Sequence, residues 1–300
     1  MGPHSGAPAR PEDQLETSRF QTSYLAIVLR QFARNRAAVA GLVLILLFVI
    51  TAVFAPVIAP HDPYTIAPAI ALQGPTQEHL LGTDELGRDV LTRILLGARI
   101  TLVITLAAVM MSLVVGASLG LLAGFYGGKV DTVIMRGVDV LMAMPGFLLA
   151  IGIIAALGVG TENLILAVGV YSIPAFARIA RGSTLSVNAE EYITAARGIG
   201  ASNWRLMLNH VLPNIASPLI VQTSLRMATA ILTASGLSFL GLGPQPPTPE
   251  WGSMLSSGRD YMTRAPLFVA VPGLAILLVT LSFNLLGDGL RDVLDPRMKQ

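Results

Sequence analysis

The 300-residue chain contains no cysteine, and only 13% of its residues are charged. Without cysteine there is no disulfide, no thiolate metal site and no cysteine nucleophile. A soluble domain normally carries about 25% charged residues, so the low charge content argues against a soluble protein. The formal net charge is only +2, which gives no strong basic surface for a nucleic acid.

Sequence motifs for catalysis and cofactor binding are also missing. The stretch "AGFYGGKV" at 123–130 lacks the first Gly and the final Ser or Thr of a phosphate-binding loop. No G-x-S-x-G nucleophile turn occurs, and the four scattered histidines (His4, His61, His79 and His210) form no H-E-x-x-H pair. We therefore expect no catalytic residue, no metal site and no cofactor on this chain.

Long hydrophobic runs dominate what is present. Hydrophobic residues make up 53% of the chain, and the mean hydropathy is +0.66. A helix that crosses a bilayer needs about 20 mostly apolar residues. The segments that meet this requirement are 39–58, 100–125, 132–157, 164–180, 215–240 and 267–286. We predict an all-α polytopic membrane protein with six transmembrane helices.

Lys and Arg residues predict the orientation of these spans, because cytoplasmic loops carry an excess of them. With both termini in the cytoplasm, fourteen of the 20 Lys and Arg residues lie on the cytoplasmic side and five lie outside. Arg226 lies within a span. The polar segment "EYITAARGIGASNWRLMLNHVLPN" at 191–214 is then cytoplasmic.

Two long loops are predicted on the outer side, at 60–99 and 241–266. They contain "LGTDELGRDVLTR" and "GLGPQPPTPEWGSML", and both combine turn-forming Gly and Pro with amphipathic stretches. Two interpretations stay open. The loops either cap the outer mouth of a pathway or receive a partner, or they are ordinary connections between spans.

The second predicted span carries Gly116, Gly120 and Gly124 at four-residue spacing. Residues with this spacing lie on one helix face, where glycine lets another backbone approach closely. We expect a structural packing face, with a moving gate interface as the alternative.

The polar segment 191–214 predicts a compact helix–turn–helix. Glu190 and Glu191 suit the positive N-terminal end of a helix, and two Gly residues, at 198 and 200, end it. Ser202 or Asn203 caps a second short helix, which Pro213 closes into the fifth span. The segment is longer than a simple connector requires, and its small-residue tip suits insertion into a groove of another protein.

Here the sequence resembles the permease subunits of ABC importers. Their cytoplasmic signature is Glu-Ala-Ala, three residues, Gly, nine residues, Ile, one residue and Leu-Pro. The positions that match are Ala195, Ala196, Gly200, Leu212 and Pro213. Thr194 stands where the family has Glu, and His210 stands where it has Ile. In this family the segment is a coupling helix that enters a cleft of a separate ATPase subunit.

The coupling role implied by this resemblance falls on one set of residues. They are Glu191, Thr194, Ala195, Ala196, Arg197, Gly200, His210, Leu212 and Pro213.

Further motifs extend the resemblance over nearly the whole chain. They are "RNRAAVAGLVLILL", "HLLGTDELGRDVLTRILLGAR", "SIPAFARIARGSTL", "LSFLGLGPQPPTPEWGSML" and "NLLGDGLRDVLDPRMK". Together they resemble the second, C-type permease of the dipeptide, oligopeptide and nickel branch. The stretches "IPAFARIARG" and "LSFLGLGPQPPTPEWG" look especially like glutathione-importing members.

The resemblance implies a MetI-like permease core in a bacterial plasma membrane, with the first span as an N-terminal addition. It also implies a sister permease in a heterodimer, two cytoplasmic ABC ATPases that carry the ATP and Mg, and an extracytoplasmic solute-binding protein. Contacts with membrane lipid are expected, and contacts with nucleic acid are not. The cargo is a dipeptide, a longer peptide or glutathione, or alternatively a nickel complex or another small solute.

The predicted organisation follows from the spans and the resemblance. A cytoplasmic tail with an amphipathic lead-in occupies 1–37, the first transmembrane helix 38–59 and an extracytoplasmic segment 60–99. The permease core occupies 100–288 and includes the coupling loop 181–213. A cytoplasmic tail at 289–300 ends the chain.

A polar stripe is predicted along the fifth span. Gln222, Arg226, Thr229 and Thr233 recur at intervals of four, three and four residues, so they share one helix face. An arginine inside a span costs at least about 2.5 kcal/mol on insertion scales, and it should therefore face protein or water. Arg226 either lines the translocation route and attracts a cargo carboxylate, or pairs with groups of the sister permease.

Two other functional classes remain as alternatives to a transport permease. An intramembrane enzyme needs a nucleophile or a metal site within the spans, and the sequence shows neither. A membrane scaffold without a pathway has no need of a polar stripe. Co-purification of an ATPase distinguishes a permease from both.

Overall fold

The computed structural model describes residues 30–294, and regular secondary structure within that range is helical apart from an isolated bridge between Thr83 and Asp89. Five helices within this range are long and apolar enough to cross a membrane. They are α2 (Arg36–Ile58), α3 (Val90–Tyr126), α6 (Thr161–Asn188), α9 (Leu212–Phe239) and α11 (Pro266–Leu294). The prediction of an all-helical membrane protein is confirmed. Parts of the predicted tails, 1–29 and 295–300, lie outside the described residues, whereas 289–294 belongs to the helix α11.

The third predicted span, 132–157, was wrong as a single helix. It consists of α4 (Gly128–Ala143) and α5 (Gly146–Leu157), which meet at an angle of 90°. Met144 is extended, with ψ 140°, because a residue that precedes proline avoids the helical region, and Pro145 follows it. Six crossings result only if this bent pair counts as one span.

The glycine face of α3 packs against α6, as the packing interpretation predicts. A Cβ added at Gly116 would lie 2.7 Å from the backbone oxygen of Ile173, and one at Gly120 would overlap the carbonyl oxygen of Ala177. A Cβ at Gly124 would lie 2.7 Å from the side chain of Thr184. Only glycine permits this approach of two backbones. The α3–α6 pair is therefore the centre of the bundle.

The first span, α2, packs against the last, α11. Asn35 caps α2 by accepting a hydrogen bond from the Ala38 backbone N–H, and its side-chain amide donates to Asp292 at 3.4 Å. A Cβ at Gly41 would lie 2.7 Å from the backbone oxygen of Ser282. The other side of α2 carries many exposed apolar side chains, which suits a helix on the lipid-facing periphery.

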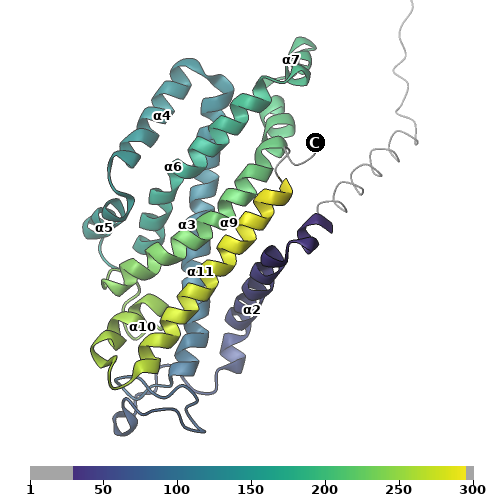
Figure 1. Ribbon diagram of the computed structural model, residues 1–300. Coiled ribbons are helices and arrows are strands. Elements are labelled where there is room, and N and C mark those ends of the chain that lie inside the picture. The colour runs from purple at the N-terminus through teal and green to yellow at the C-terminus, as the bar shows by residue number, and fades with distance from the viewer. Residues whose placement is uncertain (1–29, 295–300) are drawn as a thin grey trace, which may run out of the picture.

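The bundle has two structurally different ends (Figure 1). The short helix α7 (Glu191–Gly198) lies at one end, and the beginning of α2 and the end of α11 are on that side. The segment between α2 and α3 and the short helix α10 (Trp251–Gly258) lie at the other end. The helix α3 starts at Val90, ten residues before the predicted span, because Asp89 accepts a hydrogen bond from Thr92 N–H and caps it.

The α3–α6 contact predicts stability changes of opposite sign for two Gly→Ala substitutions. Gly120→Ala places a methyl group against the α6 backbone, and overpacking of this kind typically costs about 1–3 kcal/mol. Gly182→Ala in α6 meets no atom within 4 Å and gains up to about 1 kcal/mol of helix propensity. Thermal unfolding of the purified protein in detergent should show a lower melting temperature for the first variant and an equal or higher one for the second. Equal melting temperatures for both variants would contradict this contact.

Candidate coupling segment and polar face

The helix α7 begins and ends where the sequence predicts. Glu190 is extended at its N-terminus, Glu191 lies in the first turn, and the helix ends at Gly198. Gly200 has φ +90°, a left-handed conformation that side chains rarely adopt. Its N–H donates to the Arg197 carbonyl at 3.1 Å, which closes the turn after the helix. The backbone conformation therefore favours glycine at this position.

The predicted second short helix was wrong as a separate element. Ser202 does cap α8 (Asn203–Arg205), but the helix continues through a π-helical stretch, η2 (Leu206–Val211), directly into α9. Residues Asn203–Phe239 form one 37-residue helical run. Pro213 lacks an N–H, and the wider π-helical turn just before it accommodates the irregular hydrogen bonding that proline causes. The coupling segment is thus attached rigidly to a span.

The structure divides the predicted coupling residues into two groups. Most of the set on and just after α7 is exposed at the end of the bundle: Glu191, Thr194, Ala195, Arg197 and Gly200. Ala196 is half-buried and packs on the core. His210 is half-buried and lies 6.5 Å from the Tyr192 ring, centroid to centroid. Leu212 and Pro213 are exposed on α9.

Residues that the sequence did not single out hold α7 in place. Ile193 is fully buried in the same core cluster as Leu206 and Val211. The Asn214 side-chain amide donates to the Tyr192 hydroxyl at 3.1 Å. These contacts connect α7 to the beginning of α9, a transmembrane helix. The burial of Ile193 could have been predicted from the sequence, because it is an apolar residue one turn before a polar tip.

Arg197 makes two further contacts with the neighbouring spans. Its guanidinium lies 5.8 Å from the centroid of the Phe125 ring, at the end of α3. It also donates to the Asn188 side-chain oxygen at 3.1 Å, at the end of α6. Both contacts are at the surface, where a cation–π interaction contributes roughly 0.5–1 kcal/mol. Through them α7 is linked to the central α3–α6 pair.

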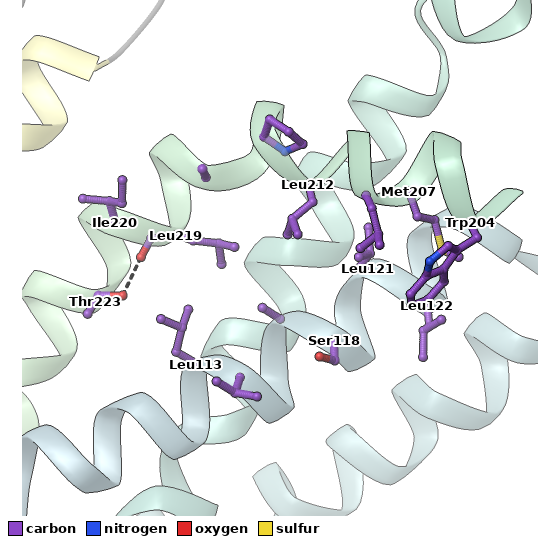
Figure 2. A pocket seen from close by; sticks show the side chains of 15 residues that line it. Leu113, Ser118, Leu121, Leu122, Trp204, Met207, Leu212, Leu219, Ile220 and Thr223 are labelled. Carbon is purple, nitrogen blue, oxygen red and sulfur yellow. Dashed lines mark hydrogen bonds between the residues drawn. The ribbon is translucent and has the colours of Figure 1, made fainter. Parts of the chain in front are cut away.

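An apolar groove of about 720 Å³ lies beside the coupling segment, between α3 and the helical run from α8 to α9. Figure 2 shows Leu113 and Leu121 of α3 facing Leu212 and Leu219, with Trp204 at one end of the groove. The hydroxyl of Thr223 donates to the Leu219 carbonyl of its own helix, at 2.7 Å. The groove therefore offers an apolar surface.

The predicted polar stripe lies on α9, and two of its members border a second hollow. Gln222 and Arg226 line a space of about 610 Å³, together with Tyr171 of α6 and the break at Pro145. Arg226 is half-buried and forms no ion pair with a carboxylate within residues 30–294. The hollow thus combines apolar walls with an available guanidinium.

The outer half of the stripe is arranged differently. Thr229 is exposed and its hydroxyl donates to the Arg226 carbonyl at 3.0 Å, whereas Thr233 is half-buried. Neither threonine borders the 610 Å³ hollow. The opposite side of α9 packs into the bundle through buried Met227 and Ile231. The four polar residues therefore share the side of α9 that the core leaves partly uncovered.

Two ion pairs tie the bent pair to α6 near this hollow. Asp131 accepts from both Nε and Nη2 of Arg181, at 2.5 and 2.6 Å. Asp139 accepts from Arg178 at 2.8 Å, and Arg178 also lines the hollow. A two-point Arg–carboxylate pair fixes orientation as well as distance. These pairs could not be read from local spacing, because the partners are about 40–50 residues apart.

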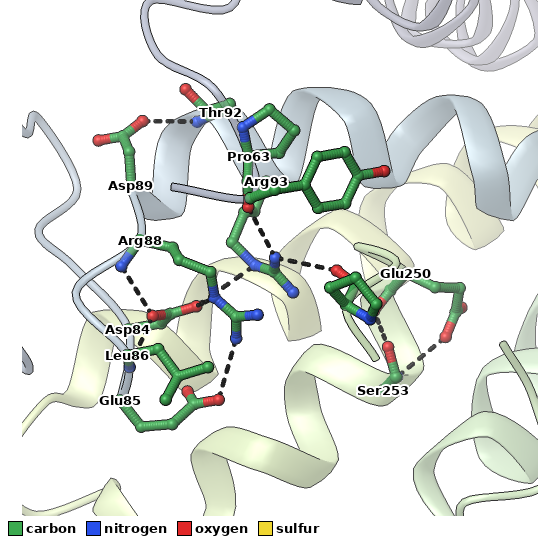
Figure 3. A network of polar contacts seen from close by, with 12 residues as sticks. Pro63, Asp84, Glu85, Leu86, Arg88, Asp89, Thr92, Arg93, Glu250 and Ser253 are labelled. Atoms are coloured by element: carbon green, nitrogen blue, oxygen red, sulfur yellow. Dashed lines mark hydrogen bonds and ion pairs between the residues drawn. The ribbon is translucent and has the colours of Figure 1, made fainter. Parts of the chain in front are cut away.

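At the other end of the bundle, charged side chains form a buried network around the start of α3 (Figure 3). Asp84 accepts from Arg88 Nε at 2.6 Å and lies 3.3 Å from Arg93 Nε. Arg88 also donates to Glu85 at 3.1 Å. Burial, and then the neighbouring Asp84 carboxylate, raise the pKa of Glu85. The motif "LGTDELGRD" therefore folds into a compact cluster of buried ion pairs.

Arg93 and Glu250 connect this cluster of ion pairs to the loop that follows α9. Arg93 donates to the backbone oxygens of Pro63 and Pro247, at 3.0 and 3.3 Å. Glu250 is buried, accepts from Thr101 at 3.2 Å and caps α10. Burial raises the pKa of Glu250.

Trp251 completes the same connection. It is fully buried and donates its ring N–H to the Ile94 carbonyl at 3.1 Å. Gly97 of α3 makes room for it, because a Cβ there would lie 2.8 Å from the indole ring. The two outer loops thus form one packed structure, which favours a cap over the interpretation as ordinary connections.

Comparison with family models gives two matches. Residues 116–300 match the binding-protein-dependent transport system inner membrane component. Residues 23–75 match the N-terminal transmembrane domain of oligopeptide transport permease C. Together the two models cover 23–75 and 116–300 and leave 76–115 unmatched.

Curated relatives match over nearly the full length. A di/tripeptide transport system permease protein of Pseudomonas aeruginosa is 49% identical, over 90% of this chain and 91% of the relative. A dipeptide transport system permease protein of Alkalihalophilus pseudofirmus is 44% identical, over 100% and 97%. A glutathione transport system permease protein of Pectobacterium atrosepticum is 47% identical, over 90% of each.

A solved structure shares the fold. The inward-facing methionine ABC transporter MetNI contains a chain that aligns with a TM-score of 0.54 at 18% identity, over 68% of this chain and 96% of that one. The core thus has the MetI-like arrangement, as predicted. From the family models and the relatives together, the chain belongs to the inner membrane components of binding-protein-dependent transport systems, as a permease subunit of an ABC importer.

Proposed function

We propose that this permease forms half of the translocation pathway of an importer for di- or oligopeptides or glutathione. The support for this cargo class is the printed function of three relatives at 44–49% identity. The observation that carries the proposal in the structure is the available Arg226 guanidinium in the hollow beside the α4–α5 break. All of these cargoes carry a carboxylate, which a guanidinium binds well.

The chain's own role in energy coupling is mechanical under this proposal. ATP and Mg bind to two separate cytoplasmic ATPases, and the exposed α7 tip enters a cleft in one of them. Ala195 provides a small exposed surface at that tip, and buried Ile193 anchors the helix behind it. Movement of the ATPase would then act on α9 through the continuous helix Asn203–Phe239.

The remaining parts of the assembly follow from this orientation. The α7 end faces the bacterial cytoplasm together with both termini, and 181–213 is the coupling loop. The packed outer loops, which include 60–99, face the extracytoplasmic solute-binding protein. The sister permease covers the exposed side of α9 and completes the pathway, while α2 contacts lipid.

A bulky residue at the α7 tip provides the sharpest test of coupling. Ala195→Trp should overpack the ATPase contact by about 1–3 kcal/mol, which corresponds to about 5–150-fold weaker docking. Ala195 is preferable to Gly200 because a side chain at Gly200 also strains the backbone. In proteoliposomes, cargo uptake and ATP hydrolysis stimulated by the binding protein should both fall.

The matched control is Ala40→Trp, at an exposed alanine on α2, the helix that contacts lipid in this proposal. It should leave the ATPase bound during purification, as wild type does. Normal stimulated hydrolysis in Ala195→Trp, with normal membrane insertion, would contradict the docking role of α7.

Two substitutions test the role of Arg226. If Arg226 lines the pathway, Arg226→Gln should leave the complex assembled and slow uptake of anionic cargo more than cationic cargo. Arg226→Lys retains the charge and should preserve most of the preference. The structural alternative, pairing with the sister permease, predicts weaker assembly of Arg226→Gln and equal loss for every cargo. An assembled Arg226→Gln complex with wild-type uptake of all cargoes would contradict both roles.

A further inference from the structure

Three side chains with metal-binding groups meet at the end of the bundle opposite α7. One ligand atom from each of His61, Glu78 and His79 lies within 4.8 Å of the others. The sequence predicts no metal site, because these residues are separated by a loop and fit no metal motif. We propose that they bind a divalent transition-metal ion of the Zn²⁺ class. Two imidazoles and one carboxylate form a known donor set for zinc.

Asp89 supplies the supporting group that such a site needs. His79 Nδ1 lies 3.0 Å from one oxygen of the Asp89 carboxylate, and His61 Nδ1 lies 3.7 Å from the other. The two rings lie beside each other, with centroids 4.7 Å apart and planes at 33°. A metal-binding histidine usually donates its second ring N–H to a carboxylate. With Nδ1 of both rings directed at Asp89, both Nε2 atoms are available to a metal.

One polar atom in this cluster lacks a partner in the metal-free arrangement. His61 Nδ1 is buried and has no hydrogen-bond partner within the described part of the chain. A buried polar nitrogen without a hydrogen-bond partner destabilises the fold. Metal binding at Nε2 fixes the proton on Nδ1 and strengthens its attraction to Asp89. A small rotation of the ring then satisfies the nitrogen.

The backbone around the cluster is already held in place. The His61 N–H donates to the Thr92 hydroxyl at 3.2 Å, and the His79 N–H donates to the Thr76 hydroxyl at 2.9 Å. Asp89 is buried at the N-terminus of α3, where its other contact is the Thr92 N–H at 2.7 Å. The histidines and their supporting carboxylate are therefore fixed relative to one rigid helix.

Glu78 is the mobile ligand. Zinc ligands at about 2.0–2.2 Å from the metal are about 3.3–3.5 Å apart in a tetrahedron. Because the three ligand atoms lie within 4.8 Å of one another, they need to approach by at most about 1.5 Å. The Glu78 side chain is exposed and can make this movement by rotation. Three protein ligands leave a fourth position for water. Bound metal would fasten the chain that leaves α2 to the turn that precedes α3.

Zinc titration of the complete transporter complex tests the site. The complex is purified with an affinity tag that contains no histidine, stripped with a chelator, and titrated with Zn²⁺ against a chromophoric chelator. Wild type should bind one equivalent more than His61→Ala or His79→Ala. Glu78→Gln should bind that equivalent at least about tenfold more weakly. Asp89→Asn keeps a capping side chain but should weaken binding about 10–100-fold.

Glu162→Gln is the matched control for Glu78→Gln, since it removes an exposed carboxylate of α6 that is not part of the cluster. It should bind as much Zn²⁺ as wild type. Zn²⁺ should also raise the melting temperature of the wild-type complex and not that of His61→Ala. If a histidine variant fails to assemble, the Zn²⁺ affinity of Glu78→Gln tests the site instead, because a substitution at this exposed side chain should not disturb folding. Equal Zn²⁺ binding in wild type and His61→Ala, or unchanged affinity in Glu78→Gln, would overturn the proposal.

Discussion

The close contact between α3 and α6 is the interaction on which the rest of the structure depends. Within a bilayer there is little hydrophobic force between helices, so close backbone packing has to supply much of the association energy. Gly116, Gly120 and Gly124 provide it along three successive turns. With α6 fixed, its two arginines can hold α4 by the ion pairs to Asp131 and Asp139. These ion pairs hold the bent pair against α6, beside the hollow that Arg226 lines.

The two ends of the bundle are stabilised by different interactions and present different surfaces. The outer end is stiffened by buried charges and by Trp251, which lock two loops onto the start of α3. The α7 end presents small exposed side chains on a helix that Ile193 anchors. Between them, α9 is continuous from the coupling segment to the polar stripe. A helix of this kind can carry a displacement from an ATPase to the pathway.

Hydropathy and spacing predicted the features that depend on local sequence. These include five long spans, the glycine face of α3 and the start of α7. Pro145 indicated a bend within 132–157, but hydropathy could not show that the segment divides into two helices at 90°, because a hydropathy window averages over a bend. The bonds from Arg93 to Pro63 and Pro247, and the meeting of His61 with His79, depend on how distant loops fold together. No local pattern encodes such contacts, so only the structure could reveal them.

Site-specific photo-crosslinking from α7 tests directly whether this helix docks on an ATPase subunit. A benzophenone amino acid at position 194, an exposed site on that helix, is illuminated in the assembled, transport-active complex, and the crosslinked product is identified by mass. If α7 docks on an ATPase subunit, we expect a crosslink between this chain and that subunit from position 194. We expect none to that subunit from position 69, at the opposite end of the bundle. An active complex in which position 194 reaches no ATPase, or reaches the solute-binding protein instead, would contradict it.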